Sequence, residues 1–129
     1  RFPVYSFLNL KIVGLLFYYI CKLLNFTHMD LSNIILVQHT ENSTSTPPDG
    51  SWLNYWTEQT GIKIPLQMVC PCCLKRCFNI QMVGAHVSDL NENIYITPTC
   101  KECNDKYKNS KAQKGKFLVD KDKLVPLNS

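Results

Sequence analysis

The chain has 129 residues, of which 45% are hydrophobic, so it is long enough for one globular domain and too short for two. Its net charge of +4 is unevenly distributed. Residues 1–28 carry three basic and no acidic groups, residues 29–99 carry three basic and six acidic groups, and residues 100–129 carry eight lysines and four acidic groups. A basic cluster of this kind suits a phosphate-facing surface, and a solvated lysine face accounts for it equally well.

The first expected element is an apolar segment at residues 1–28, in which Ile12–Cys21 runs without charge between Lys11 and Lys22. This run of ten residues is short for a membrane span, which needs about 20, and no convincing signal-peptide cleavage site follows it. Two interpretations stay open, a membrane anchor and an extension foreign to the natural protein, because Met29 could be the initiator. The second is slightly favoured and predicts a cytoplasmic protein, whereas a native segment predicts a membrane-anchored one.

Residues 29–50 are predicted to be a linker. They start with a short apolar run, Ile34–Val37, and then become the small polar residues and two prolines of Glu41–Gly50. Such residues cannot support a packed element. The folded domain is therefore expected at residues 51–129.

An aromatic helix is expected at the start of this domain, with Ser51 as its N-cap and Gly61 at its end. Trp52, Tyr55 and Trp56 share one face of it, because they lie at i, i+3 and i+4 spacing. Aromatic side chains this dense are more often core than ligand platform. We expect the helix to pack as a lid on the rest of the domain, with nucleic-acid stacking as the minor alternative.

Two Cys-x-x-Cys pairs, Cys70/Cys73 and Cys100/Cys103, bracket a spacer of 26 residues. Four thiolates in two i, i+3 pairs suit a closed tetrahedral site for structural Zn²⁺. The alternatives are disulfide-bonded turns or scattered buried thiols. The paired spacing and the odd total of seven cysteines favour metal and a reducing compartment.

The remaining cysteines are Cys21, Cys72 and Cys77. Cys72 lies inside the first pair and could replace Cys73 as a ligand. Cys77 is expected to be a small buried hydrophobe. A metal of this kind would dominate the stability of so small a domain, since a structural zinc contributes roughly 10–16 kcal/mol of apparent binding energy.

The other expected elements follow in chain order. They are an extended lead-in at 62–69, a strand at 78–87, a polar turn at 88–93, a return strand at 94–97, a helix that begins at 99, and short strands at 117–119 and 124–127. Gly84 in the first strand allows a bulge or a close approach. Thr99 and Glu102 form a capping-box pattern at the start of the helix. The predicted class is α+β.

The order of knuckle, strand with a histidine, turn, strand and knuckle at a helix start resembles the HNH, or His-Me finger, endonucleases in their zinc-bearing form. The resemblance covers Cys70–Lys111 and implies a zinc-stabilised treble-clef or ββα-metal module, here with an N-terminal aromatic helix. More narrowly, the motifs WLNYWTEQTG, GAHV, YITPTCKECN and FLVD…LVPLN are similar to a small family of bacterial HNH-like proteins. That narrower match spans Trp52–Asn128.

The resemblance implies a catalytic site. His86 would be the general base in phosphodiester hydrolysis, and His86 and Asn104 would bind a catalytic divalent ion such as Mg²⁺. Asn93, with Asn91 as the second choice, would be the middle asparagine that braces the hairpin and orients the histidine. The remaining residues of the implied site, which would contact DNA phosphates, are Lys106, Lys108 and Lys111.

One departure from the family pattern weakens the implied catalysis. Many HNH sites place Asp or His directly before the catalytic histidine as a second ligand of the catalytic ion, and here that residue is Ala85. The expected function is a metal-dependent DNA endonuclease. The alternatives are a catalytically inactive treble-clef zinc module that binds nucleic acid or a protein partner, and a membrane-tethered zinc protein if residues 1–28 are native.

Overall fold

The computed structural model describes residues 13–17, 31–40, 46–108 and 115–127. The chain divides into two compact units, Arg1–Asn33 and Ile34–Ser129. In the first unit, residues 13–17 are helical and Leu31–Asn33 form a 3-10 turn, η1. Within the described part of the chain, no helix is both long and apolar enough to cross a membrane. Most of the apolar segment, including Cys21 and His28, lies outside the described residues.

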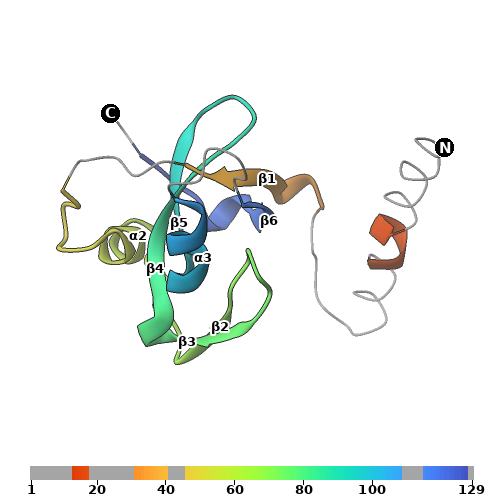
Figure 1. The fold of residues 1–129 in the computed structure, drawn as a ribbon. Coiled ribbons are helices and arrows are strands. Elements are labelled where there is room, and N and C mark those ends of the chain that lie inside the picture. The colour runs from red at the N-terminus through yellow and green to blue at the C-terminus, as the bar shows by residue number, and fades with distance from the viewer. Residues whose placement is uncertain (1–12, 18–30, 41–45, 109–114, 128–129) are drawn as a thin grey trace. The chain divides into compact units, whose positions relative to one another are not determined.

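The second unit is a mixed α+β fold that is mostly sheet (Figure 1). Its strands are β1 (Ile34–His39), β2 (Gln67–Val69), β3 (Arg76–Phe78), β4 (Met82–Ser88), β5 (Ile94–Cys100), β6 (Lys116–Asp120) and β7 (Val125–Pro126). Its helices are α2 (Trp52–Thr60) and α3 (Lys101–Tyr107), with 3-10 turns η2 (Asn79–Gln81) and η3 (Lys121–Lys123). Five strands form one antiparallel sheet in the order β6-β1-β4-β5-β7, and β2 and β3 form a separate two-stranded sheet.

Strand β1 corrects the predicted domain boundary, because it lies inside the expected linker at residues 29–50. It pairs with β6 from Ile34 to Gln38 and with β4 at Gln38 and His39. The short apolar run was too brief to indicate a strand by itself. It becomes one because both of its edges find partners that are far away in the sequence. The folded unit therefore begins at Ile34 and not at Ser51.

The hairpin of β4 and β5 is the centre of the large sheet. Its register runs from Met82 opposite Cys100 to Ser88 opposite Ile94, so the return strand is longer than the four residues predicted. The predicted first strand, 78–87, is interrupted. Turn η2 separates β3 from β4, and the Gln81 side chain accepts a hydrogen bond from the Phe78 N–H at 2.8 Å.

Helix α2 begins and ends as its sequence predicts. The Ser51 hydroxyl accepts a hydrogen bond from the Asn54 N–H at 3.0 Å, and Gly61 ends the helix in the left-handed region with φ of 70°. The helix packs on β4 and β5, where a Cβ at Gly84 would lie 2.5 Å from the carbonyl carbon of Trp52. Gly84 is therefore needed for close approach of the helix to the strand, one of the two roles predicted for it.

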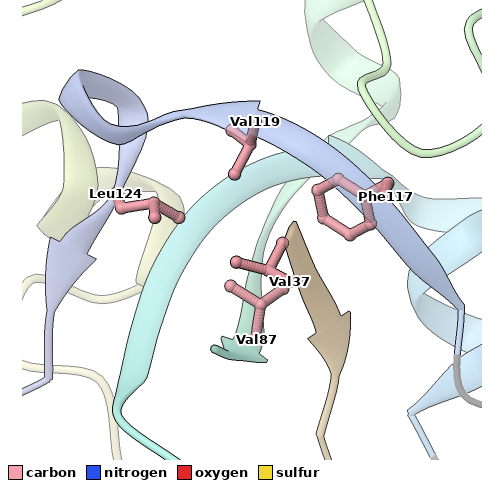
Figure 2. Packing of buried hydrophobic residues seen from close by; sticks show 5 residues of the cluster. All are labelled: Val37, Val87, Phe117, Val119 and Leu124. Carbon is pink, nitrogen blue, oxygen red and sulfur yellow. The ribbon is translucent and has the colours of Figure 1, made fainter. Parts of the chain in front are cut away.

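One part of the apolar core lies against the large sheet (Figure 2). Its buried members come from four segments of the chain, and they are Val37, Val87, Phe117, Val119 and Leu124. In Figure 2 these side chains point toward one another between β6, β1 and β4. A second cluster joins Trp56 to Ile96 and Val125 beneath α2, where the Trp56 indole N–H donates to the Lys123 carbonyl at 2.8 Å.

Candidate metal centre

The four cysteines of the two Cys-x-x-Cys pairs converge, as predicted. Their sulfur atoms all lie within 4.8 Å of one another. The Sγ atoms of Cys70 and Cys103 are 4.0 Å apart, and those of Cys73 and Cys100 are 3.9 Å apart. Zn–S bonds of about 2.3 Å in a tetrahedron require S···S edges of about 3.8 Å. The cluster therefore has the size and the donor set of a structural zinc site.

The first knuckle, which contains Cys70 and Cys73, is a tight turn between β2 and β3. The Cys70 carbonyl accepts from the Leu74 N–H at 2.8 Å, and the Cys70 N–H donates to the Lys75 carbonyl at 2.9 Å. Closing this turn places Leu74 in the left-handed region, with φ of 62°. A residue with a Cβ pays a conformational cost there that glycine does not.

The second knuckle lies at the start of α3. Cys100 is the N-cap residue, and its sulfur accepts from the Cys103 N–H at 3.4 Å. The predicted N-cap, Thr99, is instead the penultimate residue of β5, because β5 extends through Cys100. The Cys100 N–H also donates to the Cys70 sulfur at 3.3 Å, so backbone hydrogen bonds from this knuckle reach the sulfur atoms of both pairs.

Three thiols of the cluster, those of Cys70, Cys73 and Cys103, have shifted pKa values. Burial raises the pKa values of Cys70 and Cys103, and further thiols close by raise that of Cys103 again. Burial also acts upward on Cys73, but hydrogen bonds from Lys75 and the other cysteines outweigh it and lower the pKa of Cys73. Burial thus disfavours the thiolate forms of Cys70 and Cys103, and a bound divalent ion would supply the compensating charge.

The remaining described cysteines, Cys72 and Cys77, are not members of the cluster. Cys73 and not Cys72 supplies the fourth sulfur, so the predicted exchange of ligands is not seen. Cys77 is buried beside the cluster, and its thiol approaches the Lys75 carbonyl at 3.5 Å, as expected of a small buried residue. All six described cysteines are free of disulfide bonds.

His86, the predicted general base, is buried under the aromatic helix. Only 4% of its surface is exposed, and its ring meets the Trp52 ring edge to face with centroids 4.9 Å apart. Its Nε2 atom has no hydrogen-bond partner among the described residues, and burial lowers its pKa. Burial thus favours the neutral form of this imidazole, which lies against Trp52.

Asn104, which was predicted to bind the catalytic ion together with His86, belongs to helix α3. This helix lies on the other side of the hairpin of β4 and β5 from His86. His86 pairs with Ile96, which packs with Trp56 of α2. The next residue, Val87, points to the opposite face of the sheet, where it pairs with His39. His39 in turn stacks on Tyr107 of α3. Figure 1 shows α2 and α3 on either side of β4.

Asn93 and Asn91 shape the turn between β4 and β5. The Asn93 side chain donates to the Asp89 carboxylate at 3.0 Å, and the backbone N–H groups of both asparagines donate to it as well. The Tyr95 hydroxyl donates to the same carboxylate at 3.1 Å. These bonds help lower the pKa of Asp89 despite the opposing effect of desolvation. Asn93 and Asp89 thus hold the turn together, and the role of Asn93 in orienting His86 stays a prediction.

The lysines predicted to contact DNA differ in their surroundings. Lys108 forms an ion pair with Asp105 at 3.4 Å, and Lys101 forms another with the same carboxylate. Lys106 lies over the Tyr107 ring, 5.3 Å from its centroid. Lys111 is outside the described residues. One acidic residue thus offsets two of the basic residues of α3.

His39 is a buried polar residue that the sequence did not single out. None of its surface is exposed, and neither ring nitrogen has a hydrogen-bond partner among the described residues. Its ring contacts those of Tyr107 and Phe117, with centroids 5.6 and 5.4 Å away. Burial lowers its pKa to about 4. The sequence did hold one indication that His39 is buried. It follows an apolar run and lies two residues after Val37, on the same face of the strand.

Comparisons of the chain with models of protein families, with curated proteins and with solved structures give no significant match.

Proposed function

We propose that the second unit is a treble-clef type zinc module that binds an anionic partner and does not cleave it. The observation that carries the proposal is the closed setting of His86, the residue that would have to act as general base. Its ring is covered by Trp52, and the helix that bears Asn104 lies across the hairpin from it. A general base must reach its proton directly or through one water molecule, and the burial of this imidazole against Trp52 opposes both.

The cysteine cluster supports a structural role for the metal. Four sulfur donors complete the tetrahedron of a zinc ion and leave no position open for water or substrate. The ion would be held by Cys70, Cys73, Cys100 and Cys103 and would join the turn between β2 and β3 to the start of α3. The module then presents these elements as a fixed surface.

The charge of the chain supports an anionic partner. The second unit has eleven basic and nine acidic residues, a net charge of +2, and its Lys75 and Arg76 are exposed directly after the first knuckle. Partners with the complementary charge are nucleic acids, acidic proteins and anionic lipid surfaces.

Incubation of the full zinc-loaded chain with supercoiled plasmid and Mg²⁺ or Mn²⁺ tests the absence of cleavage. We expect no more nicking than with the His86→Ala variant. Retention on a heparin column tests the binding: Lys75→Gln/Arg76→Gln should elute at lower salt than the wild type. Lys121→Gln/Lys123→Gln is the matched control, because it removes the same charge from a segment that also holds Asp120 and Asp122. Equal shifts in both variants would contradict a specific basic surface.

The HNH endonuclease is the second candidate function. It is favoured by the Nε2 atom of His86, a buried polar atom without a described partner at the position where the family resemblance implies the base. Catalysis would require α2 to uncover His86 and α3 to change its position on the hairpin, so that His86 and Asn104 could reach one divalent ion. Metal-dependent nicking that is lost in both His86→Ala and Asn104→Ala would establish this function and overturn the first.

A further inference from the structure

We infer that the hairpin of β2 and β3 docks on an anionic membrane surface and inserts its exposed apolar side chains among the lipids. The inference rests on the proposed function, because it names the anionic partner of the same module. The hairpin of β2 and β3, together with the residues that flank it, has five exposed apolar side chains, Leu66, Val69, Leu74, Phe78 and Ile80. We call them the hairpin apolar patch.

The two faces of the small sheet differ in what they contact. Met68 pairs with Cys77, and both pack against the cysteine cluster. The neighbouring pairs, Gln67 with Phe78 and Val69 with Arg76, point the other way because side chains alternate along a strand. The inner face therefore belongs to the zinc module, and the outer face presents Phe78 and Val69 as diagonal neighbours. In Figure 1 the hairpin stands apart from the large sheet.

Leu74 at the turn is not explained by the stability of the fold. Its side chain is 75% exposed, and its backbone has the positive φ that favours glycine. The turn would close at lower conformational cost with glycine at this position. A large apolar residue that gains little from the fold and strains its backbone is expected to serve a contact outside the chain.

The charges around the patch point to an anionic occupant. From Gln59 to Ser88 the sequence has no acidic residue and three basic ones, Lys63, Lys75 and Arg76. A second copy of the chain is disfavoured, because a symmetric contact would bring like charges together. Exposed apolar side chains beside exposed basic ones, here Leu74 beside Lys75 and Arg76, suit the boundary between anionic headgroups and acyl chains.

The same combination occurs in the first unit. Residues 1–28 also carry three basic and no acidic groups, and the described apolar side chains of 13–17 are exposed there. All acidic residues of the chain lie outside these two stretches. Stable attachment to a membrane takes two weak signals, and the chain has two.

Co-sedimentation of the full zinc-loaded chain with phosphatidylcholine vesicles, with and without phosphatidylserine, tests the inference. We expect binding that requires phosphatidylserine and weakens with salt. Leu74→Gly should lower it roughly tenfold while leaving thermal stability unchanged or raised, since the strain is relieved. Lys75→Gln or Arg76→Gln should each lower it roughly fivefold.

Leu90→Ser is the matched control. Leu90 is 85% exposed in the turn between β4 and β5, but it stands beside Asp89 and near Glu92. Its variant should bind vesicles as the wild type does. Vesicle binding that Leu74→Gly leaves unchanged, or that Leu90→Ser weakens as much, would overturn the inference.

The same variants separate this inference from the proposed function. If the chain binds no vesicles but keeps its salt-sensitive retention on heparin, the partner is a nucleic acid or an acidic protein. The membrane inference then fails and the binding module stands. Plasmid cleavage that depends on His86 would overturn the module itself, whatever the vesicles show.

Discussion

Two regions of the second unit are held together by different chemistry. Around Cys70 and Cys103, the small sheet and the start of α3 are joined by sulfur atoms, with Met82 as the main buried hydrocarbon beside them. Around Val37 and Phe117, the strands β1, β4 and β6 are joined by branched and aromatic side chains alone. The first region requires a cation to balance its thiolates, and the second requires only the exclusion of water.

This difference indicates which part of the second unit should depend on zinc for its stability and which part should not. Strand β4 belongs to both regions, since its Met82 pairs with Cys100 at one end and its Val87 lies toward the other. His39 lies where the regions meet, because its ring contacts Phe117 of the sheet region and Tyr107, which packs against the cysteine cluster. Substitutions in each region, and at this junction, therefore test the division.

The largest effect is expected from loss of the metal ligands. Cys100→Ser/Cys103→Ser should abolish binding of about one zinc per chain and unfold the small sheet and α3, because roughly 10–16 kcal/mol of apparent binding energy is lost. Metal analysis and hydrogen exchange measure both outcomes. Cys77→Ala, a buried cysteine outside the cluster, should keep the zinc. A double serine variant with normal zinc content would refute the assigned ligands.

The sheet region should fail independently of zinc. Phe117→Ala should lower the free energy of unfolding by about 3–5 kcal/mol, the usual cost of removing a buried phenyl ring, with zinc content unchanged. Leu118→Ala is the control on the same strand, because its exposed side chain should contribute within about 0.5 kcal/mol. Urea denaturation of both variants gives the comparison. Loss of zinc from the folded Phe117→Ala variant would show that the regions are not separable.

The junction should respond to pH. His39 has its pKa lowered to about 4 from an ordinary value of 6.5, so the unfolded chain binds its proton first as pH falls. The neutral imidazole therefore contributes fully to the free energy of unfolding above pH 6.5, and this contribution is lost as pH falls toward 4. At pH 5 the loss amounts to about 2 kcal/mol. His39→Phe should lack this part of the pH dependence. Thiolate ligands also bind protons in this range, so the difference between the two chains in urea denaturation at pH 7.5 and 5 is the measurement. Parallel pH profiles would contradict a neutral buried imidazole.

The smallest effect is expected outside both regions, at the start of α2. Ser51→Ala should cost about 1 kcal/mol, because the Asn54 N–H loses its acceptor. Ser51→Asp restores an acceptor and should recover the stability. Thermal denaturation followed by circular dichroism distinguishes the two. A Ser51→Ala chain as stable as the wild type would mean that this cap contributes nothing measurable.

The sequence predicted what short-range chemistry determines. The Ser51 and Gly61 ends of α2 and the two Cys-x-x-Cys turns depend on spacings of a few residues. The helix ends were confirmed, and so was the convergence of the four cysteines, which the preference of zinc for four thiolates predicts. It did not predict that β1 joins the large sheet, because pairing between Ile34 and Asp120 depends on contacts across almost the whole second unit. Nor could it say which face of β4 the aromatic helix would cover, and that choice decides the surroundings of His86.

The position of β1 has a consequence for synthesis. Its pairing with β4 is confined to Gln38 and His39, so Ile34–Val37 depend on β6 for their hydrogen-bonded partner. A ribosome makes β1 before β6, and the large sheet can be completed only when β6 has emerged. Until β6 appears, the nascent chain therefore carries an unpaired strand rich in isoleucine, leucine and valine, the kind of edge that recruits other chains. A chain released before β6 is complete should aggregate even when its zinc site is fully loaded.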